Sequence, residues 1–143
     1  MSDYQHILVG IDLSEEAKHV AHKAASLAKS FGARLSMMHV IEPLSFAYGG
    51  DIPMDLSSVQ DEIQQQANDQ LGSLAKAYGV AEDDQHITLG RAEIEIHRFA
   101  EQQGIDLIVV GSHGRRGLAL LLGSTANGVL HGASCDVLAV RVQ

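Results

Sequence analysis

Residues 106–125 read DLIVVGSHGRRGLALLLGST, and this stretch decides the fold class. It opens with an apolar run that is rich in β-branched side chains and ends in glycine, which is typical of a strand buried on both faces. Gly111 and Gly114 let the backbone turn and come close to a ligand. Residues 123–125 (GST) then predict the start of a helix, whose free N–H groups attract anions. The stretch therefore predicts a strand, a glycine-rich turn and a helix N-terminus suited to a phosphorylated ligand.

Strand and helix patterns alternate along the rest of the chain. Short apolar runs predict strands over residues 6–10, 34–41, 86–89, 106–111 and 136–142. Apolar residues at helical spacing predict helices over residues 15–31, 57–78, 92–103 and 123–132, the first with Ser14 as its N-cap and the others with glycine stops such as Gly104. This alternation implies an α/β fold with a mostly parallel sheet and helices on both faces.

Two loops follow the carboxyl ends of predicted strands, over residues 10–14 and 111–124. Open parallel sheets bind ligands beyond these ends, at the point where the strand order reverses. The two loops face one crevice if the first and fourth strands are neighbours.

Length and charge narrow the class of protein. The chain has 143 residues, which fits a single domain over 1–143, and its formal net charge is −8. An acidic protein is a poor general binder of nucleic acid or of membrane surfaces. The single cysteine, Cys135, excludes an internal disulfide. No secretory signal or membrane span is visible in the sequence, so we expect a cytoplasmic protein that is not inserted in a membrane.

The glycine-rich stretch contains Arg115 and Arg116, the only adjacent Lys/Arg pair in the chain. They either contact a bound anion or form a solvated loop pair. Two better-known phosphate motifs are absent from the sequence: there is no G-x-x-x-x-G-K-S/T, and no G-x-G-x-x-G follows the first strand.

Histidine and cysteine offer weaker signals. His19 and His22 are three residues apart on a predicted helix, but no cysteine or carboxylate joins them at zinc-ligand spacing, which favours structural or surface roles. His113 lies in the glycine loop, where it could touch a ligand or simply form a hydrogen bond. Cys135 precedes an apolar strand, which favours a buried, inert thiol. We expect no metal site and no catalytic triad.

Three segments resemble the universal stress proteins: HILVGIDLS (6–14), MMHVIE (37–42) and the closing block over 106–142. The resemblance covers essentially the whole chain. It implies a three-layer α/β/α fold with a five-stranded parallel sheet in the order 3-2-1-4-5, of the adenine nucleotide alpha hydrolase-like, Rossmann-like type. It also implies a homodimer.

The family's ATP-binding members carry the motif G-x2-G-x9-G-S/T. Gly111 and Gly114 match its first pair, and Gly123 with Ser124 match its end, but eight residues stand between Gly114 and Gly123 instead of nine. Another branch, close to universal stress protein A, lacks the motif and does not bind ATP. The chain length and the N-terminal half resemble that branch too, so both alternatives stay open.

The resemblance carries nucleotide-binding roles onto particular positions. Asp12 matches an acidic residue near the ribose and adenine, beside Gly10, Ile11 and Leu13, and the backbone of Val40 matches an adenine contact. Asp12 could equally cap the helix that follows it. The ribose and phosphate cradle is matched by Gly111, His113, Gly114, Gly123, Ser124 and Thr125, to which we add Arg115 from its position in the loop.

The last strand lies at an edge of a sheet in the order 3-2-1-4-5. It is apolar and has no proline or lysine to block pairing with another chain, so such an edge needs a cover. Antiparallel pairing with a two-fold mate would supply one, and the alternative is a strand docked only on its own sheet. The expected dimer interface consists of Val137, Leu138, Ala139, Val140, Arg141 and Val142.

Three functions follow from these features. The first is a cytoplasmic, dimeric stress-response regulator that binds an adenine nucleotide, ATP with or without Mg²⁺, and changes its shape or its affinity for an unidentified protein partner. The second is a dimeric interaction protein of the universal stress protein A branch that needs no nucleotide. The third, a slow ATPase with at most weak hydrolysis, ranks last because the sequence supplies no clear general base.

Overall fold

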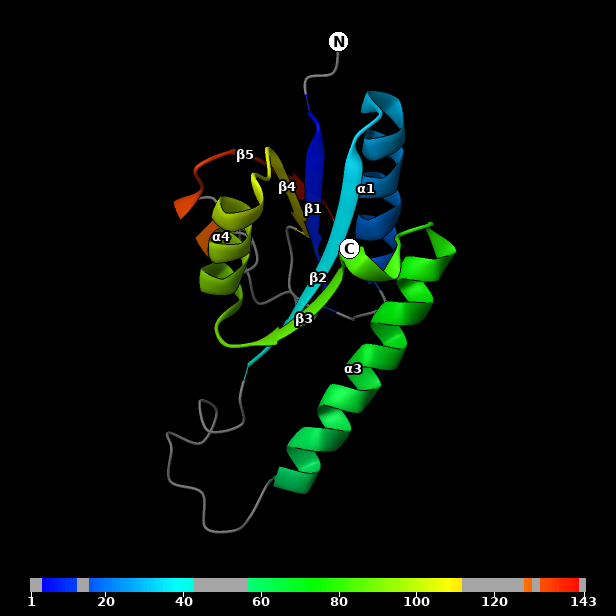
Figure 1. Cartoon of the computed structure of the whole chain (residues 1–143), viewed down its shortest axis with the longest axis vertical. Helices are drawn as coiled ribbons and strands as arrows, with labels where there is room; N and C mark the ends of the chain where they lie inside the picture. Colours follow the sequence, from blue (N-terminus) through cyan, green and yellow to red (C-terminus); the bar gives the residue numbers. More distant parts are fainter. Residues whose placement is uncertain (1–3, 13–15, 43–56, 112–127, 130–131, 142–143) are drawn as a thin grey trace.

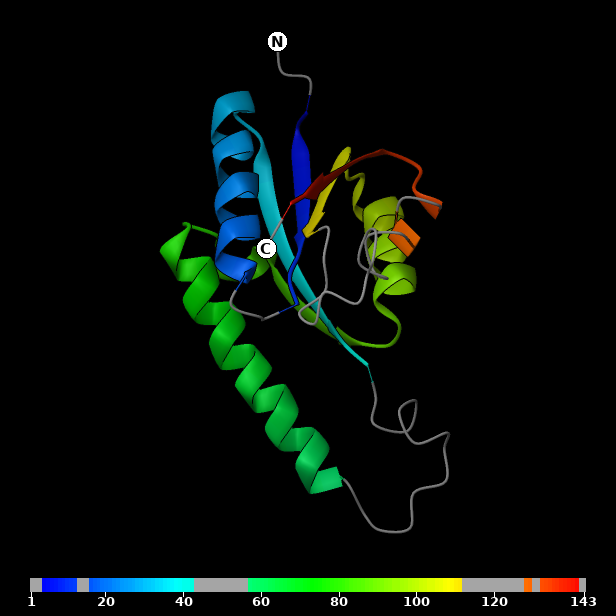
Figure 2. The same ribbon diagram turned by 180° about the vertical axis from the view of Figure 1, so that it is seen from behind.

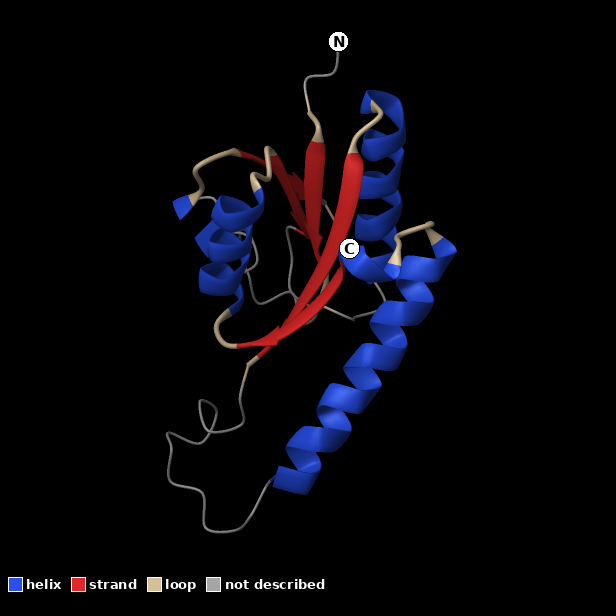
Figure 3. Ribbon diagram, in the orientation of Figure 1, coloured by secondary structure: helices blue, strands red, loops and turns tan. Residues whose placement is uncertain are grey.

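The computed structural model describes residues 4–12, 16–42, 57–111, 128–129 and 132–141. A parallel sheet with the strand order β3-β2-β1-β4-β5 forms its centre, which confirms the expected fold class (Figures 1 and 3). Its five strands are β1 (His6–Gly10), β2 (Arg34–Ile41), β3 (Gln85–Leu89), β4 (Leu107–Gly111) and β5 (Asp136–Val140).

Helices connect the strands as the alternation predicts. They are α1 (Ala17–Phe31), α3 (Ser57–Ala77), the short 3-10 helix η1 (Glu82–Asp84) and α4 (Ala92–Gln103). Gly32 and Gly104 end α1 and α4 with φ of 64° and 66°, a conformation that glycine adopts without strain. Glu16 takes the N-cap position of α1. The predicted cap, Ser14, lies outside the described residues.

The two faces of the sheet carry separate apolar clusters, so the molecule has three layers (Figures 1 and 2). Helices α1 and α3 cover one face, where Ile7, Val9 and Met37 pack against alanines of α1 and leucines of α3. Helix α4 covers the other face, where Leu8 and Ile108 are fully buried. Alternate side chains of β1 therefore enter opposite clusters, as expected for a strand in the middle of a parallel sheet.

Helix α3 continues past the ends of the strands β2 and β3 (Figure 1). Val59, near the start of α3, is 43% exposed, whereas Ala67 and Leu71 farther along the helix are buried. None of the described helices is both long and apolar enough to cross a membrane. Of the helix predicted over 123–132, residues 128, 129 and 132 are described, and they are helical.

Candidate functional site

The first and fourth strands are neighbours, so the two predicted loops leave the sheet side by side. β1 pairs in parallel with β4, with Val9 opposite Val109, and Gly10 and Gly111 end the two strands. From β1 the chain moves outward to β2 and β3, and then returns to add β4 and β5 on the other side. The strand order therefore reverses between β1 and β4, which is where open parallel sheets bind ligands.

Gly10 lies at a crowded point of this reversal. A Cβ atom at Gly10 would stand 3.2 Å from Ile96 Cδ1 and 3.3 Å from Val110 Cγ1, which is tighter than ordinary packing. Gly10 is not among the described glycines with positive φ, so space and not backbone conformation requires the glycine. Its missing side chain lets α4 and β4 close tightly around the end of β1.

Ile11 follows β1, and β2 holds both polar groups of its backbone. The Ile11 N–H donates to the Met38 carbonyl at 2.8 Å, and its carbonyl lies 2.6 Å from His39 Nδ1. Because a carbonyl oxygen only accepts, Nδ1 carries the proton of the His39 ring. Burial lowers the pKa of His39, while the hydrogen bond to Ile11 and the charge of Asp12 act in the opposite direction. The ring is therefore neutral at neutral pH.

The described part of the site places Gly10, Ile11 and Asp12 together at the end of β1. Asp12 is exposed there, Val40 is half-buried near the end of β2, and Gly111 ends β4. The other predicted contacts lie outside the described residues: Leu13, His113, Gly114, Arg115, Gly123, Ser124 and Thr125.

The end of the helix that follows the glycine-rich stretch packs closely on α4. His97 Nε2 lies 2.9 Å from the Val129 carbonyl and donates to it, and Val129 is fully buried. Gly128 and Gly132 allow this approach, because a Cβ at either one would collide with Glu93 or His97. Helix α4 thus anchors the chain beyond the glycine-rich stretch.

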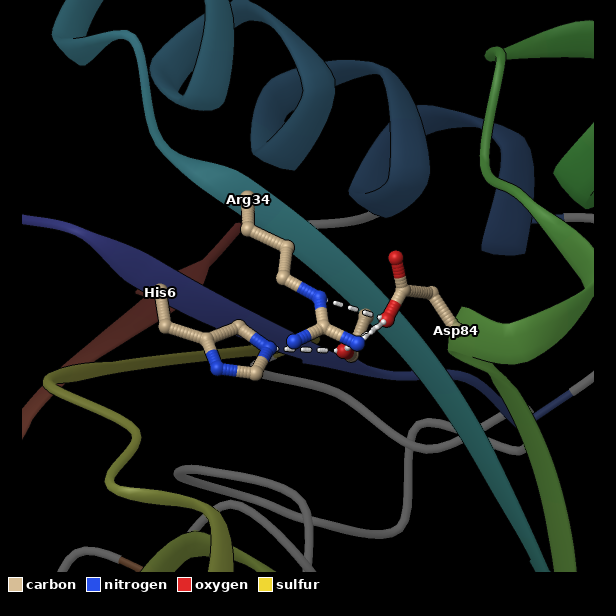
Figure 4. Close-up of polar contacts among 4 residues, drawn as sticks. His6, Arg34 and Asp84 are labelled. Carbon is tan, nitrogen blue, oxygen red and sulfur yellow. Dashed lines mark hydrogen bonds and ion pairs between the residues drawn. The ribbon is translucent and has the colours of Figure 1, made fainter.

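A second polar cluster lies at the opposite, N-terminal end of the strands (Figure 4). The buried Ser36 hydroxyl donates to Asp84 Oδ1 at 3.2 Å, and His6 Nε2 approaches the same hydroxyl at 2.8 Å. Arg34 donates from Nε to Asp84 Oδ1 at 2.8 Å. Because these residues come from β1, β2 and η1, the cluster joins three neighbouring segments of the chain. The sequence signal for it was Ser36, a polar residue inside an apolar strand.

Burial and neighbouring charges in this cluster shift the pKa values of Asp84 and His6. Burial alone would raise the pKa of Asp84, but hydrogen bonds from Arg34 and Ser36 and the charge of Arg34 hold it below its usual value. Burial and the charge of Arg34 lower the pKa of His6. The Asp84 carboxylate therefore supports the fold at neutral pH, whereas protonation of His6 opposes it.

Removal of the Asp84 carboxylate should destabilise the protein. We expect Asp84→Ala to lower the free energy of unfolding by about 1–2 kcal/mol, because the buried Ser36 hydroxyl loses its acceptor. Asp84→Asn should have a smaller effect at neutral pH, since the amide oxygen can still accept that hydrogen bond. Urea denaturation of both variants measures the loss, and Asp83→Ala, at an exposed neighbouring position, is the matched control.

The pH dependence of the free energy of unfolding provides a second test of the role of the Asp84 carboxylate. A depressed carboxyl pKa stabilises the fold above the unfolded value of 3.8, and this stability is lost as the pH falls through the lower folded pKa. The difference between wild type and Asp84→Asn should therefore be constant near pH 7 and shrink below about pH 4. A difference that is constant down to pH 3 would contradict the carboxylate's role.

The other residues singled out in the sequence form no reactive set in the described structure. Within the described ranges, no group of three or more His, Cys, Asp or Glu side chains could hold a metal ion. His19 and His22 are exposed on α1, and the His22 ring contacts Tyr78. Burial and the charges of two neighbouring aspartates raise the pKa of Cys135, so it stays a thiol at neutral pH.

The sequence of the chain is similar to those of known proteins. The sequence profile of the Universal stress protein family matches residues 3–141. Universal stress protein A homolog 1 of Coxiella burnetii is 43% identical over 138 residues, which cover 96% of each chain. The match therefore spans both strand ends of the candidate site.

Solved structures agree with the sequence match. The universal stress protein UspA from Lactobacillus plantarum superposes with a TM-score of 0.80 at 25% identity, over 99% of this chain and 100% of that one. A universal stress protein solved in complex with cAMP superposes with a TM-score of 0.64 at 27% identity, over 97% and 98% of the two chains. The sheet order, the match to the family profile and the 43% identity to Universal stress protein A homolog 1 show that the chain belongs to the universal stress protein family.

Proposed function

We propose that the chain is a cytoplasmic, dimeric stress-response regulator that binds an adenine nucleotide between the turn after β1 and residues 111–125. The observation that carries the proposal is the reversal of strand order between β1 and β4, which places Gly10 and Gly111 side by side. The cAMP complex of a relative that is 27% identical supports an adenine nucleotide as the ligand class.

The residues at this point suit the chemistry of a nucleotide. Asp12 presents an exposed carboxylate, which can accept hydrogen bonds from ribose hydroxyls. Phosphates need donors and positive charge, and the chain offers both in Arg115, Ser124 and Thr125. ATP with Mg²⁺ is the form that we propose first, and the bound nucleotide would change the protein's affinity for a protein partner.

The dimer is proposed through β5. This strand stands at the edge of the sheet beyond β4, and Val137, Leu138 and Ala139 are only half-buried there. An edge strand with half-buried apolar side chains favours pairing with a second copy. Arg141 and Val142 would extend the same interface.

The direct test is nucleotide binding by the purified full-length protein. We expect isothermal titration calorimetry to detect binding of ATP with Mg²⁺, and denatured protein to release nucleotide that was carried through purification. Gly123→Val should abolish binding, with affinity reduced at least about a hundredfold, because a side chain would enter the proposed phosphate cradle. Sedimentation velocity serves as the control, since the variant should stay dimeric.

A second function is favoured by one observation. Only eight residues separate Gly114 from Gly123, one fewer than in the ATP-binding motif, and this favours an interaction protein that needs no nucleotide. If neither ATP with Mg²⁺ nor cAMP binds and no nucleotide copurifies, the first proposal is wrong and the second takes its place. A dimer in the absence of any nucleotide is expected under both.

A further inference from the structure

The His39 ring reaches from β2 to the turn after β1. Its Nδ1 donates to the Ile11 carbonyl at 2.6 Å, a short hydrogen bond in a partly buried setting. Ile11 itself is only 5% exposed. A buried carbonyl that lost this donor would have to find another partner or remain unsatisfied, which is unfavourable.

This hydrogen bond fixes more than one carbonyl. The peptide bond is planar, so the Ile11 C=O and the Asp12 N–H belong to one rigid unit. The Ile11 N–H on the preceding peptide is bound to the Met38 carbonyl at 2.8 Å. Two neighbouring residues of β2, Met38 and His39, therefore set the orientation of the two peptides that lead into Asp12.

We infer that His39 is a positioning residue of the nucleotide site, which holds the turn after β1 so that Asp12 faces the ligand; this inference rests on the proposed function. His39 acts through the Ile11 peptide and needs no contact with the nucleotide. The role differs from that of His6, whose ring bonds to Ser36 at the far end of the same sheet. Both rings are partly buried and hydrogen-bonded, but only His39 adjoins the strand-order reversal.

Three variants separate positioning from general stability. His39→Leu removes the donor, whereas His39→Asn restores one, because the amide nitrogen of asparagine stands where Nδ1 stands in histidine. His6→Gln is the matched control at the opposite end of the sheet. We expect His39→Leu to weaken binding of ATP with Mg²⁺ about tenfold, His39→Asn to recover most of that loss, and His6→Gln to leave the affinity unchanged.

Hydrogen exchange of the Ile11 amide in the ligand-free protein supplies a readout that does not depend on nucleotide. We expect faster exchange in His39→Leu and near wild-type exchange in His39→Asn and His6→Gln. Unchanged exchange in His39→Leu would overturn the inference, whether or not nucleotide binds. If exchange accelerates but the affinity falls no further than in His6→Gln, the positioning role is also wrong. Failure of wild type to bind ATP or cAMP would instead refute the proposed function, and the exchange data would still decide whether His39 holds the turn.

Discussion

Leu8→Ala should lower the free energy of unfolding by about 3–5 kcal/mol, which is a large fraction of the stability of a typical domain. Leu8 is fully buried in the middle of the central strand β1. Its cluster includes Met38 on β2, Ile108 on β4 and Val129 beyond the glycine-rich stretch. Truncation to alanine would open a cavity among elements that are all held by other contacts, so little collapse can offset the loss.

Urea denaturation measures this effect, and Leu89→Ala is the matched control. Leu89 ends the edge strand β3 and is 45% exposed, so the same truncation there should cost less than about 1 kcal/mol. Equal losses at the two positions would show that the central strand is not packed as described.

Gly10→Val should reduce both stability and nucleotide affinity. The Cβ alone would come within 3.3 Å of both Ile96 and Val110, and the two methyl groups of valine add volume to the same space. Overpacking of this kind costs about 1–3 kcal/mol. A shift of α4 or β4 away from β1 would relieve these contacts and would widen the strand-order reversal that the proposed site uses. We therefore expect ATP affinity to fall at least about tenfold.

Gly72→Val controls for the substitution itself. Gly72 lies in α3, and the nearest atom to an added Cβ is Gln85 Oε1 at 3.9 Å, an ordinary contact. Valine there should leave stability unchanged or raise it slightly, because glycine is the poorer helix former. Thermal unfolding and calorimetry on both variants test the contrast. Wild-type affinity in a folded Gly10→Val variant would argue against a site at this reversal.

Local signals in the sequence predicted most of the fold. The strand over residues 34–41 and the helix over 92–103 have the predicted bounds, because each is marked by an apolar run or by helical spacing and ends at a turn residue. The start of α1 was less well predicted. Ser14 and the two glutamates after it fit an N-terminal signature, yet Glu16 takes the N-cap position and makes no side-chain cap. Ala17 and Val20, in the first turn of the observed helix, are both buried in the cluster on this face of the sheet.

Local sequence patterns could not predict the hydrogen bonds between residues that are far apart in the chain. His39 bonds to Ile11, 28 positions earlier, and Ser36 to Asp84, 48 positions later. Both pairs depend on the register between strands, which periodicity alone does not give. A polar residue in a buried strand does indicate that its side chain has a hydrogen-bond partner. Ser36 and His39 in RLSMMHVI therefore indicate two hydrogen bonds from a buried strand, but the sequence does not identify their partners.

The central position of β1 has a consequence for the order of folding. β1 pairs with β2 from His6 to Arg34, a separation of 28 residues, but with β4 from Ile7 to Leu107, a separation of 100 residues. During synthesis β1 and β2 can assemble with α1 well before β4 has emerged, because near contacts close at lower entropic cost than distant ones. The strand-order reversal does not exist in that early half-sheet. The chain thus completes its proposed nucleotide crevice in one of its last folding steps, and a nascent or truncated chain ending before β4 would have Asp12 but no crevice for it to line.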